Sequence, residues 1–363
     1  MIVGVPKEVK THEYRVGLTP TSVRELVAHG HQVIIEPNAG SGIGAPDSAY
    51  EKAGARIGDP WEAELIVKVK EPQPQERKRL KEKHILFTYL HLAPDPQQAK
   101  DLVASNAICI AYETVTRAGG GLPLLAPMSE VAGRMAIQVG ASCLEKARGG
   151  MGILLGGVPG VAPAKITILG AGVAGSSAAR LAVGSGARVY ALDRSLEVLR
   201  SMEREFGARV VTVYSSRDAV EQHVLSADLV VGAVLVPGAA APRLVSRQMV
   251  TAMKPGAVAV DIAIDQGGCF ETSRPTTHAD PTYVVDGVVH YCVTNMPGAV
   301  GRTSTYALCN VTLPYVMQLA RKGYDRAVLE NIGLSQGVNV RHGYVTNPAV
   351  AETFGLPCKG VLE

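Results

Sequence analysis

The stretch Lys165-Ile-Thr-Ile-Leu-Gly-Ala-Gly-Val-Ala-Gly-Ser-Ser-Ala-Ala-Arg-Leu181 decides the fold of this chain. An apolar-leaning run leads straight into Gly170, Gly172 and Gly175, and small residues at helical spacing follow. Gly170 permits a tight turn, Gly172 lets the backbone approach a pyrophosphate, and Gly175 lets the helix pack closely on the strand. The N–H groups at the start of the helix then face the phosphates. The stretch therefore predicts a strand, a phosphate-binding turn and a helix.

The next stretch, Arg188-Val-Tyr-Ala-Leu-Asp193, completes this pattern. It is typical of the neighbouring parallel strand, and Asp193 stands at about the spacing of a carboxylate that binds the adenosine ribose hydroxyls. The combination favours dinucleotide binding over the alternative, a glycine-rich turn in an unrelated α/β domain. Arg194 could accept a 2′-phosphate, but Asp193 repels one, so NAD is favoured over NADP.

The composition indicates a two-domain α/β protein. The chain has 363 residues, 39 glycines and 47% hydrophobic residues, and its formal charge of +3 is too small to argue for nucleic acid. The six cysteines form no C-x-x-C, and no H-E-x-x-H or zinc-spaced Cys/His set occurs, so we expect no metal and a reducing compartment. The N-terminus is typical of a strand, not a signal peptide, and no apolar run approaches the ~20 residues of a membrane span. We expect a cytoplasmic protein without a membrane partner.

Strands and helices alternate along the chain. Before the glycine turn the pattern predicts strands at 2–5, 32–36, 65–69, 84–90 and 108–112 and helices at 20–29, 46–53, 76–83 and 95–105. After the turn it predicts strands near 189–192, 209–213, 229–234 and 257–262. Repeated βα units of this size imply parallel sheets with right-handed crossovers.

Two long helical patterns stand near the domain boundaries. One covers 128–147 and is capped at Ser129, and the other covers 303–322 and is expected to be interrupted near Pro314. A last unit at 338–354 is too small to fold alone, so we expect it to return to the first domain. The prediction is an α/β fold of two Rossmann-like domains, with the NAD domain (126–302) inserted in a substrate domain (1–125 and 303–363). The two long helices would link the domains, with a cleft there.

Four polar residues lie where ligands bind in open parallel sheets, beyond the carboxyl ends of strands. Arg15 follows the first strand and Lys70 ends another, so together they could bind a carboxylate, although each alone could be a solvated surface cation. His91 ends a third strand and could transfer protons, the alternative being a structural histidine. Asp265 follows the strand at 258–263, where it would face the nicotinamide. Asp261 lies inside that strand and is the other candidate for this role. Its position is more typical of a buried, hydrogen-bonded acid.

The chain resembles the NAD-dependent L-alanine dehydrogenase family along nearly its full length. The resemblance is carried by Gly4-Val-Pro-Lys-Glu8, Glu13-Tyr-Arg-Val-Gly-Leu-Thr-Pro20, Val67-Lys-Val-Lys-Glu-Pro72, Leu86-Phe-Thr-Tyr-Leu-His-Leu92, Leu124-Leu-Ala-Pro-Met-Ser-Glu-Val-Ala-Gly-Arg134, Gly156-Gly-Val-Pro-Gly-Val161, Gly232-Ala-Val-Leu-Val-Pro-Gly238, Val260-Asp-Ile-Ala-Ile-Asp-Gln-Gly-Gly-Cys-Phe-Glu271 and Ser304-Thr-Tyr-Ala-Leu308.

The resemblance implies roles for matching residues. Arg15 and Lys70 would bind the pyruvate or alanine, joined by Asn295, while His91 and Asp265 would be the acid–base pair. The implied cofactor contacts are Ser129, Gly170, Gly172, Val173, Gly175, Asp193, Ser215, Val234, Leu235, Ile262, Ala263, Ile264, Asp265, Arg274, Asn295 and Met296. At Val198 the family usually has a polar contact, so this chain departs from the pattern on the adenosine side.

The implied reaction is reversible oxidative deamination of L-alanine to pyruvate, ammonium and NADH, in a homohexamer. Three alternatives remain open at this stage. The first is the NAD-binding component of a proton-translocating transhydrogenase, which would need a membrane partner and no substrate carboxylate site. The second is a saccharopine- or lysine-pathway dehydrogenase of related fold. The third is a catalytically silent NAD-binding protein that senses redox state.

Overall fold

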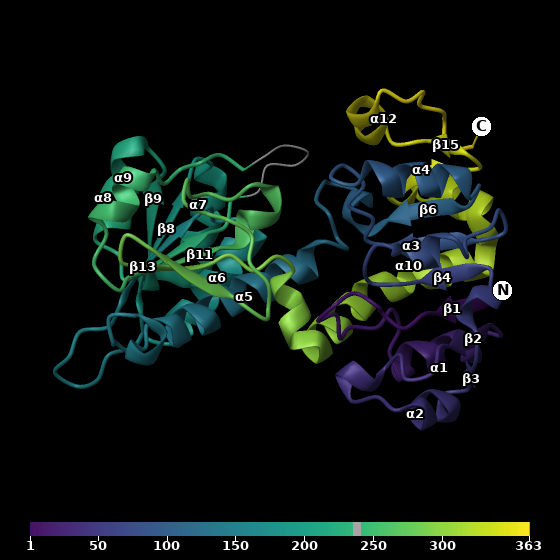
Figure 1. Ribbon diagram of the computed structural model, residues 1–363, viewed down its shortest axis with the longest axis horizontal. Coiled ribbons are helices and arrows are strands. Elements are labelled where there is room, and N and C mark those ends of the chain that lie inside the picture. The colour runs from purple at the N-terminus through teal and green to yellow at the C-terminus, as the bar shows by residue number, and fades with distance from the viewer. Residues whose placement is uncertain (235–240, 363) are drawn as a thin grey trace. The chain divides into compact units, whose positions relative to one another are not determined.

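The computed structural model describes residues 1–234 and 241–362, which form two compact units. Unit 1 comprises Met1–Met128 and Gly298–Glu363, and unit 2 comprises Ser129–Pro297. Unit 2 is therefore inserted in the chain of unit 1. In Figure 1, unit 1 runs from purple to blue and then yellow, while unit 2 is teal to green. The fold class predicted from the sequence, two α/β domains with one inserted in the other, is confirmed.

Unit 1 is built on an eight-stranded sheet. Its order is β15-β14-β6-β5-β4-β1-β2-β3, with parallel pairing from β6 through to β3 and antiparallel pairing of β14 with β6 and of β15 with β14. The strands are β1 (Ile2–Val5), β2 (Gln32–Ile35), β3 (Arg56–Ile57), β4 (Leu65–Val67), β5 (Ile85–Thr88), β6 (Ile108–Ala111), β14 (Val338–Arg341) and β15 (Tyr344–Val345). The last unit of the chain thus returns to the first domain, as predicted.

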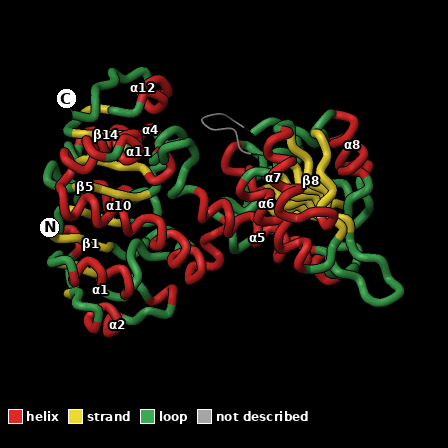
Figure 2. The backbone as a smooth tube through the Cα atoms, turned by 180° about the vertical axis from the view of Figure 1, so that it is seen from behind, coloured by secondary structure: helices red, strands yellow, loops and turns green. Residues whose placement is uncertain are grey.

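Helices lie on each face of this sheet in the opposite views of Figures 1 and 2. They are α1 (Pro20–Ala28), α2 (Asp47–Lys52), α3 (Pro74–Arg77), α4 (Pro96–Ala104), α10 (Gly301–Glu330), α11 (Ile332–Gln336) and α12 (Pro348–Phe354). The N-caps follow the expected chemistry, since the Thr19 side chain accepts a hydrogen bond from Ser22 N at 3.2 Å and Asp95 accepts one from Gln98 N at 2.9 Å.

Two helix predictions in unit 1 were wrong. The helix predicted at 76–83 covers only Pro74–Arg77, and the side chains of Glu76 and Arg77 are buried. The helix α10 continues through Pro314, and its break lies at Gly323, whose φ of 72° is non-helical. Pro314 lacks an N–H and so forfeits one backbone hydrogen bond, whereas Gly323 takes a positive φ that a helix cannot contain.

Unit 2 is built on a seven-stranded sheet of order β12-β13-β11-β10-β7-β8-β9, parallel except for β12 against β13. The strands are β7 (Lys165–Leu169), β8 (Arg188–Asp193), β9 (Val210–Tyr214), β10 (Leu229–Gly232), β11 (Val258–Asp261), β12 (Thr282–Val285) and β13 (Val288–Tyr291). The helices are α6 (Val173–Gly184), α7 (Leu196–Phe206), α8 (Arg217–Leu225) and α9 (Arg247–Ala252). The sequence did not predict the β12–β13 hairpin.

The chain passes between the units at two places. The first, Met128 to Ser129, lies inside α5 (Ala126–Cys143), so Ser129 is not the N-cap that the sequence predicted. The second, Pro297 to Gly298, lies in a short 3₁₀ helix (η7, Met296–Val300) that precedes α10. The expected domain boundaries were at 125/126 and 302/303.

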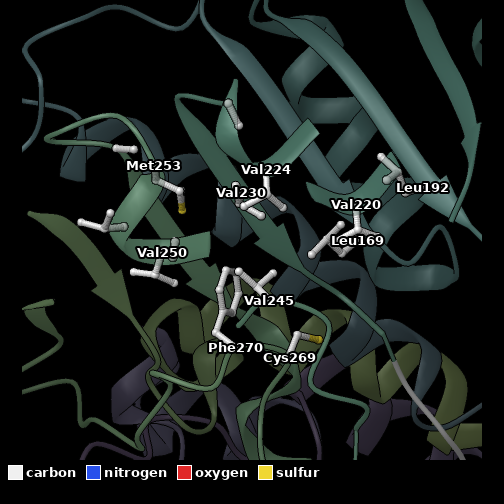
Figure 3. Close-up of a cluster of buried hydrophobic side chains, with 14 of the residues drawn as sticks. Leu169, Leu192, Val220, Val224, Val230, Val245, Val250, Met253, Cys269 and Phe270 are labelled. Carbon is white, nitrogen blue, oxygen red and sulfur yellow. The ribbon is translucent and has the colours of Figure 1, made fainter. Parts of the chain in front are cut away.

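Unit 2 packs its sheet on an apolar cluster that Figure 3 shows in close-up. Leu169 and Val230 come from central strands, Val224 from α8 and Val250 from α9, and Phe270 belongs to the same cluster. Five of the six cysteines are buried thiols and Cys358 is exposed. Among the described helices, none combines the length and the apolar character that crossing a membrane requires.

Candidate active site

Arg15 lies in the loop after β1, and a buried carboxylate holds it. Its Nε and Nη2 donate hydrogen bonds to the two carboxylate oxygens of Glu13, each at 2.6 Å, and its Nη1 lies 3.2 Å from Met128 Sδ. Both charged side chains are almost fully buried. Burial alone would lower the pKa of Arg15, but the hydrogen bonds and charge of Glu13 raise it above its ordinary value. The guanidinium is thus a permanent cation held in one orientation.

Lys70 follows β4, and the sequence prediction for this segment was wrong in one respect. The strand predicted at 65–69 ends at Val67, so Lys70 lies in the loop beyond the strand and does not end it. The Nζ of Lys70 lies 3.7 Å from Glu71 Oε2, and Lys10 Nζ lies 2.5 Å from Glu71 Oε1. Burial raises the pKa of Glu71, but these two lysines outweigh that effect, so its pKa is lowered. Lys70 is largely enclosed, with 12% of its side chain exposed.

A buried charge cluster supports the backbone on which Lys70 stands, and the sequence analysis missed it. Lys68 Nζ, with no exposed surface, lies 3.2 Å from Glu8 Oε2 and 2.7 Å from Glu76 Oε1. Glu8 Oε1 also accepts hydrogen bonds from Val69 N at 2.8 Å and Lys70 N at 3.4 Å. Burial raises the pKa of Glu8, against the opposing charge of Lys68. A lysine inside an otherwise apolar strand pattern was the signal that could have revealed this cluster.

His91 lies in the loop after β5 in a left-handed backbone conformation, with φ at 47°. The predicted strand at 84–90 is shorter, since β5 covers only Ile85–Thr88. Glu113 holds the turn, because its Oε1 accepts hydrogen bonds from His91 N at 2.6 Å and Leu90 N at 3.1 Å. The imidazole stacks on Tyr89 with ring centroids 5.6 Å apart, and its Nδ1 lies 3.9 Å from Glu113 Oε1. The sequence analysis missed Glu113, although it follows β6 just as His91 follows β5.

The sheet of unit 1 therefore brings three predicted residues to neighbouring strand ends. Arg15, Lys70 and His91 follow β1, β4 and β5, which are adjacent in the order β5-β4-β1. Parallel strands end at the same edge of a sheet, so the loops that carry these two cations and the imidazole leave the sheet at one edge. A planar fork, a compact ammonium and a group that titrates near neutrality suit a small carboxylate substrate that exchanges protons.

The glycine turn of unit 2 has the geometry that its sequence predicts. Gly170 has φ of 92°, and a Cβ at Gly175 would lie 1.9 Å from Gly170 O. A Cβ at Gly172 would instead meet nothing within 4 Å, so this position borders open space at the start of α6. The turn thus leaves room for a pyrophosphate at the N-terminus of a long helix, where backbone N–H groups are available. These residues fit a bound dinucleotide.

Asp193 is the last residue of β8, and its carboxylate binds the loop after β7 and the loop after β8. Its Oδ2 accepts a hydrogen bond from Ala171 N and its Oδ1 one from Ser195 N, both at 2.8 Å. Ser215 follows β9 and donates its backbone N–H to Asp193 O at 3.0 Å. Two residues predicted to contact the cofactor, Asp193 and Ser215, are thus joined by a backbone hydrogen bond. Arg194 is exposed.

Asp265 and Asp261 lie in different environments. The strand β11 ends at Asp261, and Asp265 lies exposed in the 3₁₀ helix η6 (Ile262–Gln266), so the predicted strand at 258–263 was too long. Asp261 is fully buried, and its carboxylate accepts hydrogen bonds from Ala263 N, Cys269 N and Ser273 Oγ at 3.1, 2.8 and 2.5 Å. Asp261 is therefore the buried, hydrogen-bonded acid that the sequence indicated.

The remaining predicted cofactor contacts are distributed over loops. Arg274 donates its backbone N–H to Tyr283 Oη at 2.8 Å, and its guanidinium lies 4.2 Å over the Tyr283 ring. Asn295 has φ of 60°, and its backbone oxygen lies 3.1 Å from His278 Nε2. Val234 is described, but Leu235 lies outside the described residues. Within 1–234 and 241–362, no group of three or more His, Cys, Asp or Glu residues could hold a metal ion.

Family models match both parts of the chain. The model described as "Alanine dehydrogenase/PNT, N-terminal domain" matches residues 4–132, and "Alanine dehydrogenase/PNT, C-terminal domain" matches residues 136–348. The alanine dehydrogenase of Halomonas elongata is 59% identical over 361 residues, covering 98% of this chain and 97% of that protein. The alanine dehydrogenase of Mycolicibacterium smegmatis is 53% identical over 362 residues, covering 98% of each chain.

Solved structures agree with these relatives. A structure titled L-alanine dehydrogenase superposes with a TM-score of 0.95 at 50% identity, covering 98% of this chain and 99% of that one. A transhydrogenase structure from Sinorhizobium meliloti is more distant, with a TM-score of 0.82 at 27% identity, covering 96% of this chain and 100% of that one. The chain therefore belongs to the alanine dehydrogenase/PNT family.

Proposed function

We propose that this protein is an NAD-dependent L-alanine dehydrogenase that interconverts L-alanine with pyruvate, ammonium and NADH. The observation that carries the proposal is the set of strand ends in unit 1, where Arg15, Lys70 and His91 follow three adjacent parallel strands. The identity of 59% to a named alanine dehydrogenase over nearly the full length supports the same substrate.

In unit 1, the cations bind the substrate. Arg15 offers a fixed fork to the carboxylate, because Glu13 already holds its Nε and Nη2 edge. Lys70 adds a compact positive charge that can also reach the carbonyl oxygen of pyruvate. Binding through two cations orients the Cα of the substrate, and orientation of this kind can supply about 7–11 kcal/mol of the barrier.

In unit 2, the backbone binds the cofactor. The α6 N-terminus beyond Gly172 faces the pyrophosphate, and Asp193 binds the adenosine ribose, which favours NAD. Val173, Ser129 and Arg274 are further proposed contacts, as are Ser215, Val234, Leu235, Ile262, Ala263, Ile264, Asn295 and Met296. Bound NAD supplies a hydride acceptor for the substrate Cα.

Proton transfer belongs to His91 and Asp265. We propose that they assist water in attacking the imine that follows hydride loss, and that they return a proton to ammonia as it leaves the carbinolamine. Each group of this kind accelerates a reaction by about 10²–10⁴-fold. Tyr89 and Glu113 hold the imidazole in place for this role, through stacking and through the hydrogen bond to the His91 backbone.

Two further parts of the proposal concern the protein in the cell. We propose a cytoplasmic enzyme, which the five buried thiols support, because disulfides are rare in a reducing compartment. We also propose a homohexamer, supported by the family resemblance alone. Light scattering of the purified protein tests this assembly, and a mass of one or two chains would contradict it.

The test of the proposed function is a substrate panel. The protein is mixed with L-alanine and NAD, and the absorbance of NADH is followed, with pyruvate, ammonium and NADH as the reverse reaction. Parallel mixtures contain NADP in place of NAD, or L-lysine, 2-oxoglutarate and NADH, in which the consumption of NADH is followed. We expect alanine-dependent NADH formation with NAD. NADH binding without turnover of any amino acid would instead indicate a redox sensor or a transhydrogenase component.

A further inference from the structure

We infer that Asp261 is a positioning residue that holds the proposed acid–base residue Asp265 in its working place. The inference rests on the proposed function, because it gives Asp265 a role beside the nicotinamide. Asp265 itself lies exposed in η6, a single 3₁₀ turn that follows the last residue of β11. Something in the core must therefore fix the geometry of this loop, and the carboxylate of Asp261 is placed to do so.

The Asp261 carboxylate joins the beginning and the end of the loop that carries Asp265. Its Oδ1 accepts a hydrogen bond from Ala263 N at 3.1 Å, at the start of η6. Its Oδ2 accepts hydrogen bonds from Cys269 N at 2.8 Å and Phe270 N at 3.4 Å, where the chain re-enters the core. Asp265 stands between these two anchors, so the loop is closed over one buried carboxylate.

A further hydrogen bond extends the same support to a second proposed cofactor contact. Ser273 Oγ donates to Asp261 Oδ2 at 2.5 Å, and the following residue is Arg274. Phe270 anchors this segment in the apolar cluster of unit 2, visible in Figure 3. One side chain therefore holds η6 and the segment that leads to Arg274.

The space around the carboxylate is closely fitted. A Cβ at Gly232 would lie 3.0 Å from Asp261 Oδ1, and a Cβ at Gly268 would lie 2.6 Å from Oδ2. Gly268 also has φ of 84°, so the turn after η6 needs glycine for two reasons. The chain thus approaches the carboxylate as closely as a backbone without side chains permits.

An amide in place of the carboxylate would break this arrangement. Four donors point at the two oxygens of Asp261, and all four need an acceptor. Asparagine has one oxygen and one NH₂ group. In either orientation, its NH₂ group would face at least one backbone N–H, and two donors would meet. Buried donors without acceptors are costly, and the loop is expected to shift to relieve them.

Asp228 provides a matched control in the same unit. It is also a largely buried acid, and it accepts hydrogen bonds from Lys165 N and Lys254 Nζ, both at 2.7 Å. It precedes β10, however, and so lies at the amino end of the sheet, opposite to the end where Asp261 closes β11. Its replacement should disturb stability without moving the Asp265 loop.

The experiment compares Asp261→Asn, Asp228→Asn and Ser273→Ala in the full-length protein. For each variant we measure kcat and KM for alanine, the NADH dissociation constant by NADH fluorescence, and Tm. Asp261→Asn is expected to lower kcat about 10²-fold, the cost of displacing a catalytic group by about 1 Å. It should also raise the NADH Kd about tenfold, as the loss of one hydrogen bond to a charged group would. Asp228→Asn should leave both quantities within about twofold of the parent, because Asp228 binds Lys165 and Lys254 and shares no hydrogen-bond partner with Asp261.

The outcomes separate a positioning role from a structural one. The inference is overturned if both variants, Asp261→Asn and Asp228→Asn, lower Tm while kcat and the NADH Kd stay at the values of the parent protein. If Asp261→Asn does not fold, Ser273→Ala decides, because it removes one of the four hydrogen bonds and keeps the carboxylate. A several-fold loss of kcat in Ser273→Ala then supports the inference, and parent-like kinetics overturn it. If the parent protein does not oxidise alanine, the proposed function is wrong. The NADH Kd values of the variants then still test whether Asp261 holds the loop.

Discussion

The two units prepare their binding sites by opposite means. In unit 1 the strand ends carry charged side chains, and further charges hold them, as Glu13 holds Arg15 and as Glu8 and Glu76 enclose Lys68. In unit 2 the corresponding edge is made by residues that lack side chains, and a Cβ at Gly172 would meet only open space. In the proposed function, one unit would present charge to a small anion, and the other would present bare backbone to a phosphate.

The difference teaches which substitutions each unit tolerates. A buried cation paired with a carboxylate is sensitive to any change of charge, because the partner left behind is buried without compensation. A backbone site is insensitive to charge but sensitive to a single methyl group. Side-chain substitutions in unit 1 should therefore impair substrate use, whereas an added methyl group at the glycine turn of unit 2 should impair NADH binding.

The largest effect is expected for His91→Ala. Loss of the proton-transfer group should lower kcat by about 10²–10⁴-fold, while NADH binding stays intact. His342→Ala is a matched control, since His342 has a similar left-handed φ of 45° and is exposed in the turn between β14 and β15. Steady-state kinetics and NADH fluorescence measure both. Loss of NADH binding in His91→Ala would instead make this histidine structural.

Arg15→Lys should break the site of unit 1 while keeping its charge. Lysine cannot keep the two-pronged bond to Glu13, so the KM for pyruvate should rise about tenfold or more, the equivalent of one charged hydrogen bond. The NADH Kd should not change. Arg24→Lys, on the exposed side of α1, is the control and should match the parent. Equal KM values for the two variants would remove Arg15 from the substrate site.

Gly172→Ala should break the site of unit 2 without unfolding it. The added methyl group meets no protein atom within 4 Å, so Tm should stay close to that of the parent. The methyl group would occupy the space of the pyrophosphate, and the NADH Kd should rise about tenfold. Gly184→Ala, later in α6 and equally open, should leave NADH binding unchanged. An unaltered NADH Kd in Gly172→Ala would place the pyrophosphate elsewhere.

The smallest effect concerns the pH dependence of stability. His84 is buried, accepts a hydrogen bond from Lys81 N at 3.0 Å, and can donate one to Trp61 O at 3.1 Å, so the neutral ring fits. Burial lowers the pKa of His84 below its value in the unfolded chain, so the unfolded state binds the proton first. Stability from this group is complete above about pH 6.5 and falls below it by up to about 1.4 kcal/mol per pH unit.

His84→Asn tests that sign, because asparagine keeps an acceptor for Lys81 N but does not titrate in this range. Unfolding is followed at about pH 7.5 and at about pH 5.5, on either side of the unfolded pKa. The variant should lose less stability on acidification than the parent. A parent and variant with the same loss would show that His84 does not contribute to it.

The sequence predicted the elements that repeat and missed the groups that support them. The alternation of strands and helices could be predicted because it follows from local periodicity, and the glycine turn because it follows from the special backbone of glycine. The ends of the strands were predicted less well. The strands end at Val67, Thr88 and Asp261, which is earlier than the apolar runs suggest. Apolar residues continue beyond a strand wherever the following loop is also buried.

The supporting residues could not be read from spacing. Glu113 binds the backbone of His91 across 22 positions, and Glu8 binds that of Lys70 across 62. Such partners become neighbours only through the order of the strands, which a single sequence does not state. Asp261 was the exception, since an acid inside an apolar strand pattern already indicated a buried, hydrogen-bonded group.

The edges of the two sheets have a consequence for handling the protein. The sheet of unit 1 ends in strands of two residues on both sides, β3 and β15, which offer little backbone to a second molecule. The sheet of unit 2 ends in β12, of four residues, and β9, of five, where Val284, Val211 and Tyr214 are exposed. Aggregation at high concentration should therefore start from the longer edge strands of unit 2. A lysine substitution at one of these exposed positions would be the first change to make against poor solubility.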